Sequence, residues 1–148
     1  MKSCTFFGHK DTLKEIEPIL VSTLIDLIKN KNVRFFYVGN HGNFDFLVRK
    51  NLKLLKIDFP HIDYAVVLSY IPLPQNMLPE EDYSDTMFFD GLENVPPKFA
   101  INKRNMWMLN KSDYVITYVE RIVGGAAKFK ELAQKKKKIV IELANMNI

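Results

Sequence analysis

The sequence predicts an α/β protein, a three-layer sandwich around a mainly parallel sheet of about five strands. Short apolar runs rich in β-branched and aromatic residues alternate along the chain with longer segments of helical periodicity. Residues 64–71 are almost continuously apolar, which is typical of a strand covered on both faces, as in parallel sheets. The length of 148 residues fits one domain, which we expect to span residues 1–148.

Each element is predicted from a local pattern. Thr12 and Glu15 have the Thr-x-x-Glu spacing of a capping box, which predicts a helix start, and Pro18 then falls in the first turn, where its missing N–H costs least. Apolar residues continue at helical spacing until Asn30. The same reasoning along the chain predicts strands at 4–8, 33–38, 64–71, 113–119 and 138–144 and helices at 12–30, 44–55, 98–110 and 124–137.

The segment from Pro72 to Pro97 interrupts this alternation. It is rich in proline and shows little periodicity, and a loop of this length in a compact domain is more often functional than idle. We expect it to close over a binding site. Within it, residues 86–89 form either a short extra strand or a turn.

The composition is that of a soluble, folded protein, with 47% hydrophobic and 26% charged residues. The net charge is +4, and the four consecutive lysines at 135–138 alone supply that much. Such a run at a helix end is most simply explained as complementing the helix dipole. A nucleic-acid surface needs basic residues spread over a face and interleaved with aromatic ones, so the pattern argues against nucleic acid as a partner.

Several other classes of protein are excluded by the sequence. Cys4 is the only cysteine, so an intramolecular disulfide is impossible, and the N-terminus lacks the apolar stretch of a signal peptide. No window approaches the roughly 18 apolar residues that span a bilayer. His41 and His61 lack the spacing to cysteines or acidic residues that indicates a metal site. We therefore expect a cytoplasmic protein with no membrane partner, no metal and no cofactor.

Two glycine-bearing turns, at 39–45 and 124–127, directly follow predicted strands. In an open α/β sheet such turns leave backbone N–H groups and a positive helix end free to hold an anion, usually a phosphate. In the second turn the small residues let a phosphate approach, and the alternative is a tight turn that needs positive φ. In the first turn, Asp45 either accepts ribose hydroxyls or caps the following helix.

Other candidates lie where loops are expected to cover a ligand crevice. Gly8, His9 and Lys10 follow the first strand, where the strand order should reverse. A lone histidine such as His9 more often lies on the surface or forms a structural hydrogen bond than contacts a ligand. Arg104, with Asn105 beside it, is suited to a bidentate contact with a phosphate or carboxylate, and the alternative is a surface ion pair with the acidic loop. Nearby Trp107 is expected to pack its own helix into the core or to lie in an oligomer interface, with base stacking as the alternative.

The opening Phe7-Gly8-His9-Lys10, the 39–45 turn, the Arg104-Asn105 pair and the Gly124-Gly125 turn together resemble the SLOG superfamily of Rossmann-like domains (Smf/DprA–LOG related). The likeness is greatest to its short bacterial YpsA-like or DUF1273-like proteins. It covers nearly the whole chain and implies a Rossmann-like domain that binds a nucleotide or a nucleotide-derived ligand.

The LOG branch of this superfamily hydrolyses the N-glycosidic bond of nucleoside 5′-monophosphates and carries a Pro-Gly-Gly-x-Gly-Thr-x-x-Glu motif. The corresponding residues 123–131 keep Gly124, Gly125 and Glu131 but lack the proline, the third glycine and the threonine. The resemblance therefore implies phosphate binding here and leaves enzymatic activity open.

The leading hypothesis is a module that binds or senses a nucleotide-type small molecule, such as a nucleoside phosphate or an ADP-ribose-like ligand, at the carboxyl ends of the strands, in a homo-oligomer. One alternative is a nucleotide N-glycosidase using one of the carboxylates of Asp45, Asp85, Glu120 and Glu131. Another is an interaction protein with a vestigial crevice. The candidate ligand- or phosphate-binding residues are Gly8, His9, Lys10, Gly39, Asn40, Gly42, Asn43, Asp45, Arg104, Asn105, Gly124, Gly125, Ala126 and Ala127.

Overall fold

The computed structural model describes residues 2–73 and 83–146. These residues form a six-stranded sheet in the order β4-β3-β2-β1-β5-β6, in which every neighbouring pair is parallel. The strands are β1 (Lys2–Gly8), β2 (Val33–Val38), β3 (Asp63–Leu68), β4 (Thr86–Phe88), β5 (Tyr114–Tyr118) and β6 (Ile139–Glu142). The predicted α/β class and parallel sheet are confirmed, with β4 as an additional edge strand.

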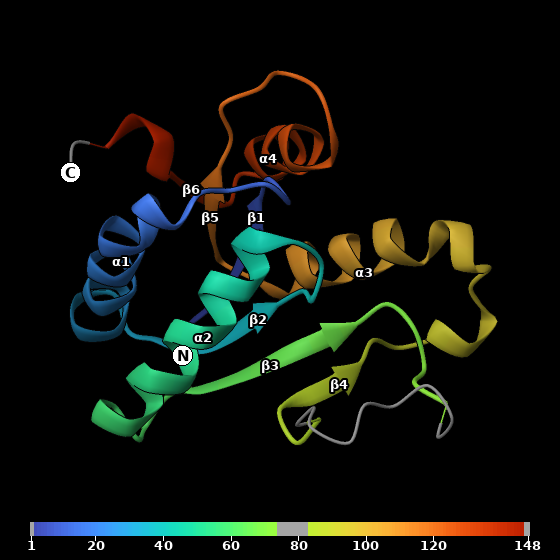
Figure 1. Ribbon diagram of the computed structural model, residues 1–148, viewed down its shortest axis with the longest axis horizontal. Coiled ribbons are helices and arrows are strands. Elements are labelled where there is room, and N and C mark those ends of the chain that lie inside the picture. The colour runs from blue at the N-terminus through green and yellow to red at the C-terminus, as the bar shows by residue number, and fades with distance from the viewer. Residues whose placement is uncertain (1, 74–82, 147–148) are drawn as a thin grey trace.

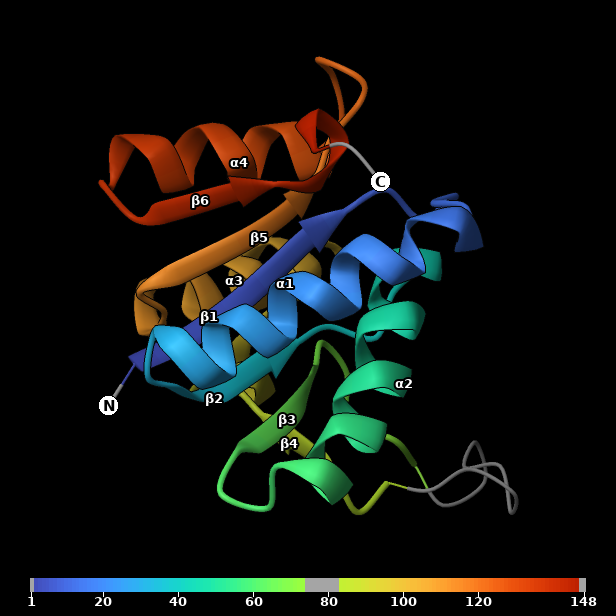
Figure 2. The ribbon, with the colours of Figure 1, turned by 90° about the vertical axis from the view of Figure 1, so that its left-hand side faces the viewer.

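Helices cover both faces of the sheet (Figures 1 and 2). In Figure 2, α1 and α2 lie in front of the sheet and α3 lies behind it. The helices are α1 (Glu17–Asn30), α2 (Asn43–Asp58), α3 (Pro97–Lys111) and α4 (Gly125–Lys135), with short 3₁₀ turns η1 (Lys14–Ile16), η3 (Leu92–Asn94) and η4 (Leu143–Asn145). None of the helices in the described part of the chain combines the length and the apolar character that a bilayer crossing requires.

The apolar core lies in two layers, one on each side of the sheet. The first joins α1 and α2 to the strands, and the second joins α3 and α4 to them. Phe6 and Phe7 of β1 point to opposite faces, because side chains alternate along a strand. The Phe6 ring packs on Phe36 at 6.2 Å in the first layer, and the Phe7 ring stacks on Phe129 at 5.1 Å in the second. A continuous apolar run is therefore what this doubly covered strand requires.

Strand β1 lies at the point where the strand order reverses. It pairs with β2 on one side and with β5 on the other. The chain adds β2, β3 and β4 in one direction and then returns to add β5 and β6 in the other. In open α/β sheets, such a switch point leaves a crevice at the carboxyl ends of the two strands that flank it.

The predicted capping box at Thr12 is wrong. Helix α1 begins at Glu17, and its N-cap, Ile16, makes no side-chain cap bond. The Thr12 hydroxyl instead donates to the carbonyl oxygen of His9 at 2.6 Å. Thr12 is buried, so its hydroxyl and that carbonyl satisfy each other inside the loop. Pro18 does fall in the first turn of α1, as predicted.

The segment expected to close over the site, 72–97, lies partly outside the described residues, since 74–82 are not described. Its later part belongs to the sheet and the core. Thr86–Phe88 pairs with β3 as the edge strand β4, and Phe89 and Leu92 are buried beside α3. The carboxylate of Asp85 accepts two bonds from Arg49, at 3.1 and 2.7 Å. Residues 83–97 do not line the cavity described below.

Candidate functional site

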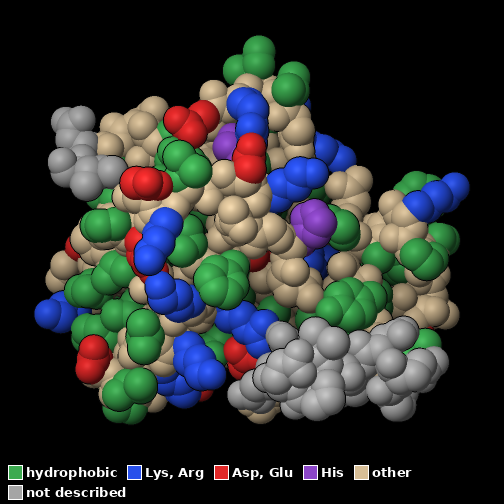
Figure 3. Space-filling view, viewed as in Figure 1, with side chains coloured by type: hydrophobic (Ala, Val, Ile, Leu, Met, Phe, Trp, Pro, Cys, Tyr) green, Lys and Arg blue, Asp and Glu red, His purple; other side chains and the backbone are tan. Residues whose placement is uncertain are grey.

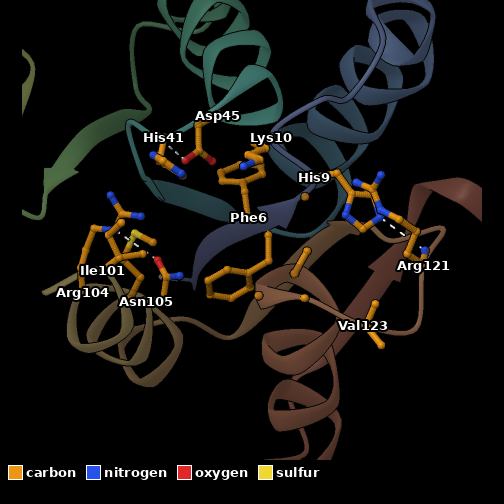
Figure 4. A pocket seen from close by; sticks show the side chains of 16 residues that line it. Phe6, His9, Lys10, His41, Asp45, Ile101, Arg104, Asn105, Arg121 and Val123 are labelled. Atoms are coloured by element: carbon orange, nitrogen blue, oxygen red, sulfur yellow. Dashed lines mark hydrogen bonds between the residues drawn. The ribbon is translucent and has the colours of Figure 1, made fainter. Parts of the chain in front are cut away.

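A cavity of about 440 Å³ opens at the carboxyl ends of β1 and β5, at the switch point of the sheet. Figure 4 shows Asp45, Arg104 and Asn105 on one side of it and His9, Arg121 and Val123 on the other. Most of the predicted site residues line it, namely Gly8, His9, Lys10, Asp45, Arg104, Asn105, Gly124, Gly125 and Ala126. The predicted residues that do not line it are Gly39, Asn40, Gly42, Asn43 and Ala127.

Arg104 is a buried cation on the α3 side of the cavity. Only 2% of the surface of Arg104 is exposed to solvent. Nη1 donates to Oδ1 of Asn40 at 3.1 Å and Nε donates to Oδ1 of Asn105 at 3.1 Å. Burial lowers the pKa of the guanidinium, and the nearby charge of Asp45 opposes this. Among the described residues the guanidinium forms no ion pair within 4.0 Å, so its charge is available to an anion in the cavity.

Asp45 places a carboxyl group close to this cation. Its Oδ2 accepts a hydrogen bond from the His41 amide at 3.0 Å. Asp45 is the third residue of α2, and the N-cap of that helix, Gly42, makes no side-chain cap bond, so the predicted helix-capping role is not observed. The predicted contact with ribose hydroxyls stays a prediction. Burial raises the pKa of Asp45 to about 6, although the His41 amide and the charge of Arg104 lower it. A Cβ on Gly39 would lie 2.7 Å from Asp45 Oδ2 and 3.0 Å from Arg104 Cζ, so only glycine leaves room for both groups here.

The N-terminus of α4 forms the opposite wall. Gly124 is its N-cap, with a φ of +104° and no side-chain cap bond. The first intrahelical bond runs from the Lys128 amide to Gly124, so the amides of residues 125–127 precede it. A Cβ on either Gly124 or Gly125 would meet nothing within 4 Å. The turn thus requires a residue with a positive φ angle at position 124. It also leaves open space in front of the N-terminus of α4, which carries a partial positive charge.

The first glycine turn serves a different purpose. The amide of Asn43, the first residue of α2, donates to the carbonyl of Lys10 at 2.8 Å, so this amide is already satisfied within the protein. A Cβ on Gly42 would lie 2.5 Å from Cα of Lys10, and a Cβ on Gly8 would overlap the ring of Phe44. These glycines permit the loop after β1 to pack against α2. Any part they play in ligand binding stays a prediction.

His9 positions the loop between β5 and α4. Its Nε2 accepts hydrogen bonds from the amides of Glu120, at 2.9 Å, and Arg121, at 3.4 Å. A nitrogen that accepts from amides carries no proton, so the imidazole is neutral with its hydrogen on Nδ1. Burial, with the charge of Arg121, lowers the pKa of His9 and favours this form. Next to it, the exposed Arg121 and Asp11 pair at 2.6 and 3.0 Å, which lowers the pKa of Asp11 to about 2.

Cationic and apolar groups from separate elements meet at this cavity. Lys10, Arg104 and Arg121 line it from the loop after β1, from α3 and from the loop after β5. Basic and histidine side chains gather on the corresponding face in Figure 3. Ile101 and Val123 also line the cavity, with 42% and 70% of their surfaces exposed. Sequence reasoning missed Arg121, Ile101 and Val123, because no local motif marks them.

Trp107 lies on α3, the same helix as Arg104. Trp107 packs edge-on against Tyr37 at 5.4 Å in the second core layer, which agrees with the helix-packing role. Within residues 2–73 and 83–146 no three histidine, cysteine, aspartate or glutamate side chains gather as a metal site would require.

A parallel sheet covered by helices on both faces, with a cavity at its switch point, defines a Rossmann-like fold. No protein-family model and no curated protein matches the sequence. Among the solved structures similar to this chain are two DNA processing proteins. DNA processing protein A (DprA) from Streptococcus pneumoniae superposes with a TM-score of 0.69 over 96% of this chain, at 14% sequence identity. DNA processing protein A from Helicobacter pylori, whose structure is described in terms of its single-stranded DNA binding mode, superposes with a TM-score of 0.62 over 95% of this chain, at 16% identity.

The chain corresponds to 50% of the Streptococcus pneumoniae protein and 64% of the Helicobacter pylori protein. The resemblance to the Smf/DprA type of Rossmann-like domain is thus confirmed at the level of the fold, and the YpsA-like assignment is not.

Two predictions are corrected by this finding. The structural neighbours are DNA processing proteins, one of them a single-stranded DNA binder, so nucleotide sensing and its glycosidase alternative are withdrawn as the function. The prediction against nucleic acid as a partner is withdrawn with them. The physical reason for the error is that Lys10, Arg104 and Arg121 are scattered in the sequence and form a basic site only in the fold.

Proposed function

We propose that this chain is a single-stranded DNA-binding domain that holds the sugar–phosphate backbone at the carboxyl ends of β1 and β5. The observation that carries the proposal is the buried guanidinium of Arg104, which lines the cavity and, among the described residues, forms no ion pair within 4.0 Å, with the carboxyl group of Asp45 as a more distant charge. A buried cation is costly unless an anion compensates it, and a phosphate supplies that charge. The fold shared with DNA processing protein A supports the same assignment.

Two groups in the cavity are suited to successive phosphates. The amides of residues 125–127 and the positive end of α4 attract the oxygens of one phosphate group. The guanidinium of Arg104 offers a planar fork of N–H donors to the next phosphate group along the strand. Lys10, which is exposed at the mouth, adds an attraction that depends on salt and not on sequence. Such contacts position a strand without reading its bases.

The apolar groups of the cavity favour a single strand over a duplex. Ile101 and Val123 present exposed apolar surface next to the cationic groups. Unpaired bases have free faces that pack on such surface, whereas the bases of a duplex are stacked inside it. A cavity of about 440 Å³ admits a nucleotide but not the convex surface of a double helix.

Membership of the SLOG superfamily, including a place among its YpsA-like proteins, is part of the proposal. The shared fold and the order of the glycine turns and of Arg104-Asn105 along the chain support it.

Fluorescence anisotropy with a labelled oligo-dT of about 20 nucleotides, and with a duplex of equal length, tests the proposal. We expect Arg104→Gln to weaken single-strand binding about 10-fold or more, because it removes a charge-assisted contact. Arg34→Gln is the matched control, since Arg34 lies at the amino end of the interior strand β2, whereas the cavity opens at the carboxyl ends of the strands; its Nε donates to Oδ1 of Asn32. We expect the control to bind as the wild type does.

Because Arg104 is buried, Arg104→Lys serves as a second variant that keeps the charge but not the planar fork. Circular dichroism and urea unfolding establish that each variant is folded. Equal affinity of the wild type and a folded Arg104→Gln variant would refute the proposed site. A wild type that binds no single-stranded DNA at low salt would refute the proposed function.

A further inference from the structure

The loop between β5 and α4 carries an apolar tip that points into solvent. Ile122 is 97% exposed and its neighbour Val123 is 70% exposed. Single exposed apolar residues are common on protein surfaces and by themselves indicate nothing. Here two lie together on the loop that leads into the N-terminus of α4.

The base of this loop is held from three directions. The amide of Val119 donates to Oε2 of Glu142 at 2.9 Å. The amides of Glu120 and Arg121 donate to Nε2 of His9. The Arg121 guanidinium also pairs with Asp11 at 2.6 Å. The tip is therefore an exposed apolar group on a fixed support, and a group ordered in advance loses less entropy when it binds.

The position of the tip relates it to the proposed phosphate contacts. Val123 lines the cavity, and the open amides of α4 begin two residues later at Gly125. In a nucleic acid strand the bases project from the backbone a few ångströms from each phosphate. An apolar side chain standing beside a bound phosphate thus meets the bases attached to it, and such side chains act as wedges between base steps in DNA-binding proteins.

We propose that Ile122, the residue just before the cavity-lining Val123, is a wedge that separates two adjacent bases of a single DNA strand as the strand leaves the cavity. This inference rests on the proposed function and deepens it. The branched side chain of Ile122 replaces the stacking of one base on the next and leaves the strand kinked at that step. Weakly stacked thymine runs lose less on insertion than adenine runs, so they are the preferred ligand.

The test uses a thymine-rich oligonucleotide of about 15 nucleotides that contains 2-aminopurine at successive positions, because stacking quenches the fluorescence of this base. At saturating wild-type protein we expect the fluorescence to rise at one step. We expect Ile122→Ser to abolish the rise while weakening the affinity less than about 10-fold, since the phosphate contacts remain. Ile57→Ser, which changes an isoleucine of α2 that is 74% exposed, is the matched control and should keep the rise.

The outcomes separate the two proposals. If the wild type and Ile122→Ser bind with the same fluorescence change, the wedge is refuted while single-strand binding stands. If the wild type does not bind the oligonucleotide, the proposed function fails and the wedge fails with it. Since Ile122 makes almost no contact with the rest of the chain, its replacement should leave the thermal midpoint unchanged, which a thermal melt of the variant measures.

Discussion

Replacement of Asp45 by asparagine should make the protein more stable at neutral pH. Asp45 is buried beside Arg104, yet the two form no ion pair within 4.0 Å. Burial raises the pKa of Asp45 from its ordinary value of 3.8 to about 6, so the folded protein disfavours the charged form. Asparagine has the shape of the protonated acid and keeps an oxygen that can accept from the His41 amide.

The size of the effect follows from the shift in pKa. Each unit corresponds to about 1.4 kcal/mol, so a rise from 3.8 to about 6 makes the ionised carboxylate cost about 3 kcal/mol at pH 7. The folded state holds the proton more tightly than the unfolded state does. The wild type therefore gains stability from this group as the pH falls from about 6 toward 3.8, and the Asp45→Asn variant does not. The advantage of the variant should fall to about half near pH 5 and vanish below pH 3.8.

Urea unfolding of both proteins at several pH values measures this difference directly. Other titrating groups are shared by the two proteins and cancel in the comparison. Asp90→Asn, at an exposed aspartate, is the control and should change the stability by less than about 0.5 kcal/mol. A variant that is less stable than the wild type at pH 7, or an advantage that does not shrink on acidification, would show that our account of the site's electrostatics is wrong.

Three further predictions concern packing, the loop and the charge of the site. Gly8→Ala should destabilise the protein by about 1–3 kcal/mol, because the added Cβ overlaps the buried ring of Phe44. Gly125→Ala has open space around the added Cβ and should leave the stability nearly unchanged. Urea unfolding measures both variants, and a larger loss of stability in Gly125→Ala than in Gly8→Ala would contradict the packing described. His9→Leu should cost about 1–3 kcal/mol, since the amides of the loop lose their acceptor. Because the pKa of His9 in the folded state lies below its ordinary value of 6.5, its contribution in the wild type is present above pH 6.5 and is lost as the pH falls below 6.5 toward that lower pKa. The cost of the variant should therefore be smaller at acidic pH, and a cost independent of pH would count against this role. Finally, the logarithm of the single-strand affinity should fall linearly with the logarithm of the salt concentration, with a slope smaller by about 1 in Lys10→Gln; an affinity that ignores salt would exclude phosphate contacts.

The layered fold could be predicted from the sequence because its strands and helices carry local signals. Phe6 and Phe7 are both buried, one on each face of β1, so the apolar run itself indicates a strand covered twice. The glycine turns were located correctly because a turn at a strand end needs Gly42 and Gly124 in conformations with positive φ.

Other features depend on contacts between distant residues and leave no local signal. The capping-box pattern at Thr12 was misleading because the buried carbonyl of His9 takes the hydroxyl. Nothing in the pattern of α3 shows that Arg104 faces inward, or that Asn40 from another turn meets it. The basic character of the cavity arises only when the ends of β1 and β5 lie side by side.

A ¹⁵N–¹H correlation spectrum of the protein, recorded during titration with oligo-dT, shows which residues contact single-stranded DNA. We expect the largest changes at the amides of Gly125, Ala126 and Ala127 and at Nε–H of Arg104, with saturation at one affinity. Changes confined to the lysines at 135–138, with the α4 amides and Arg104 unmoved, would show that DNA binds through an exposed basic run and not through the cavity at the switch point.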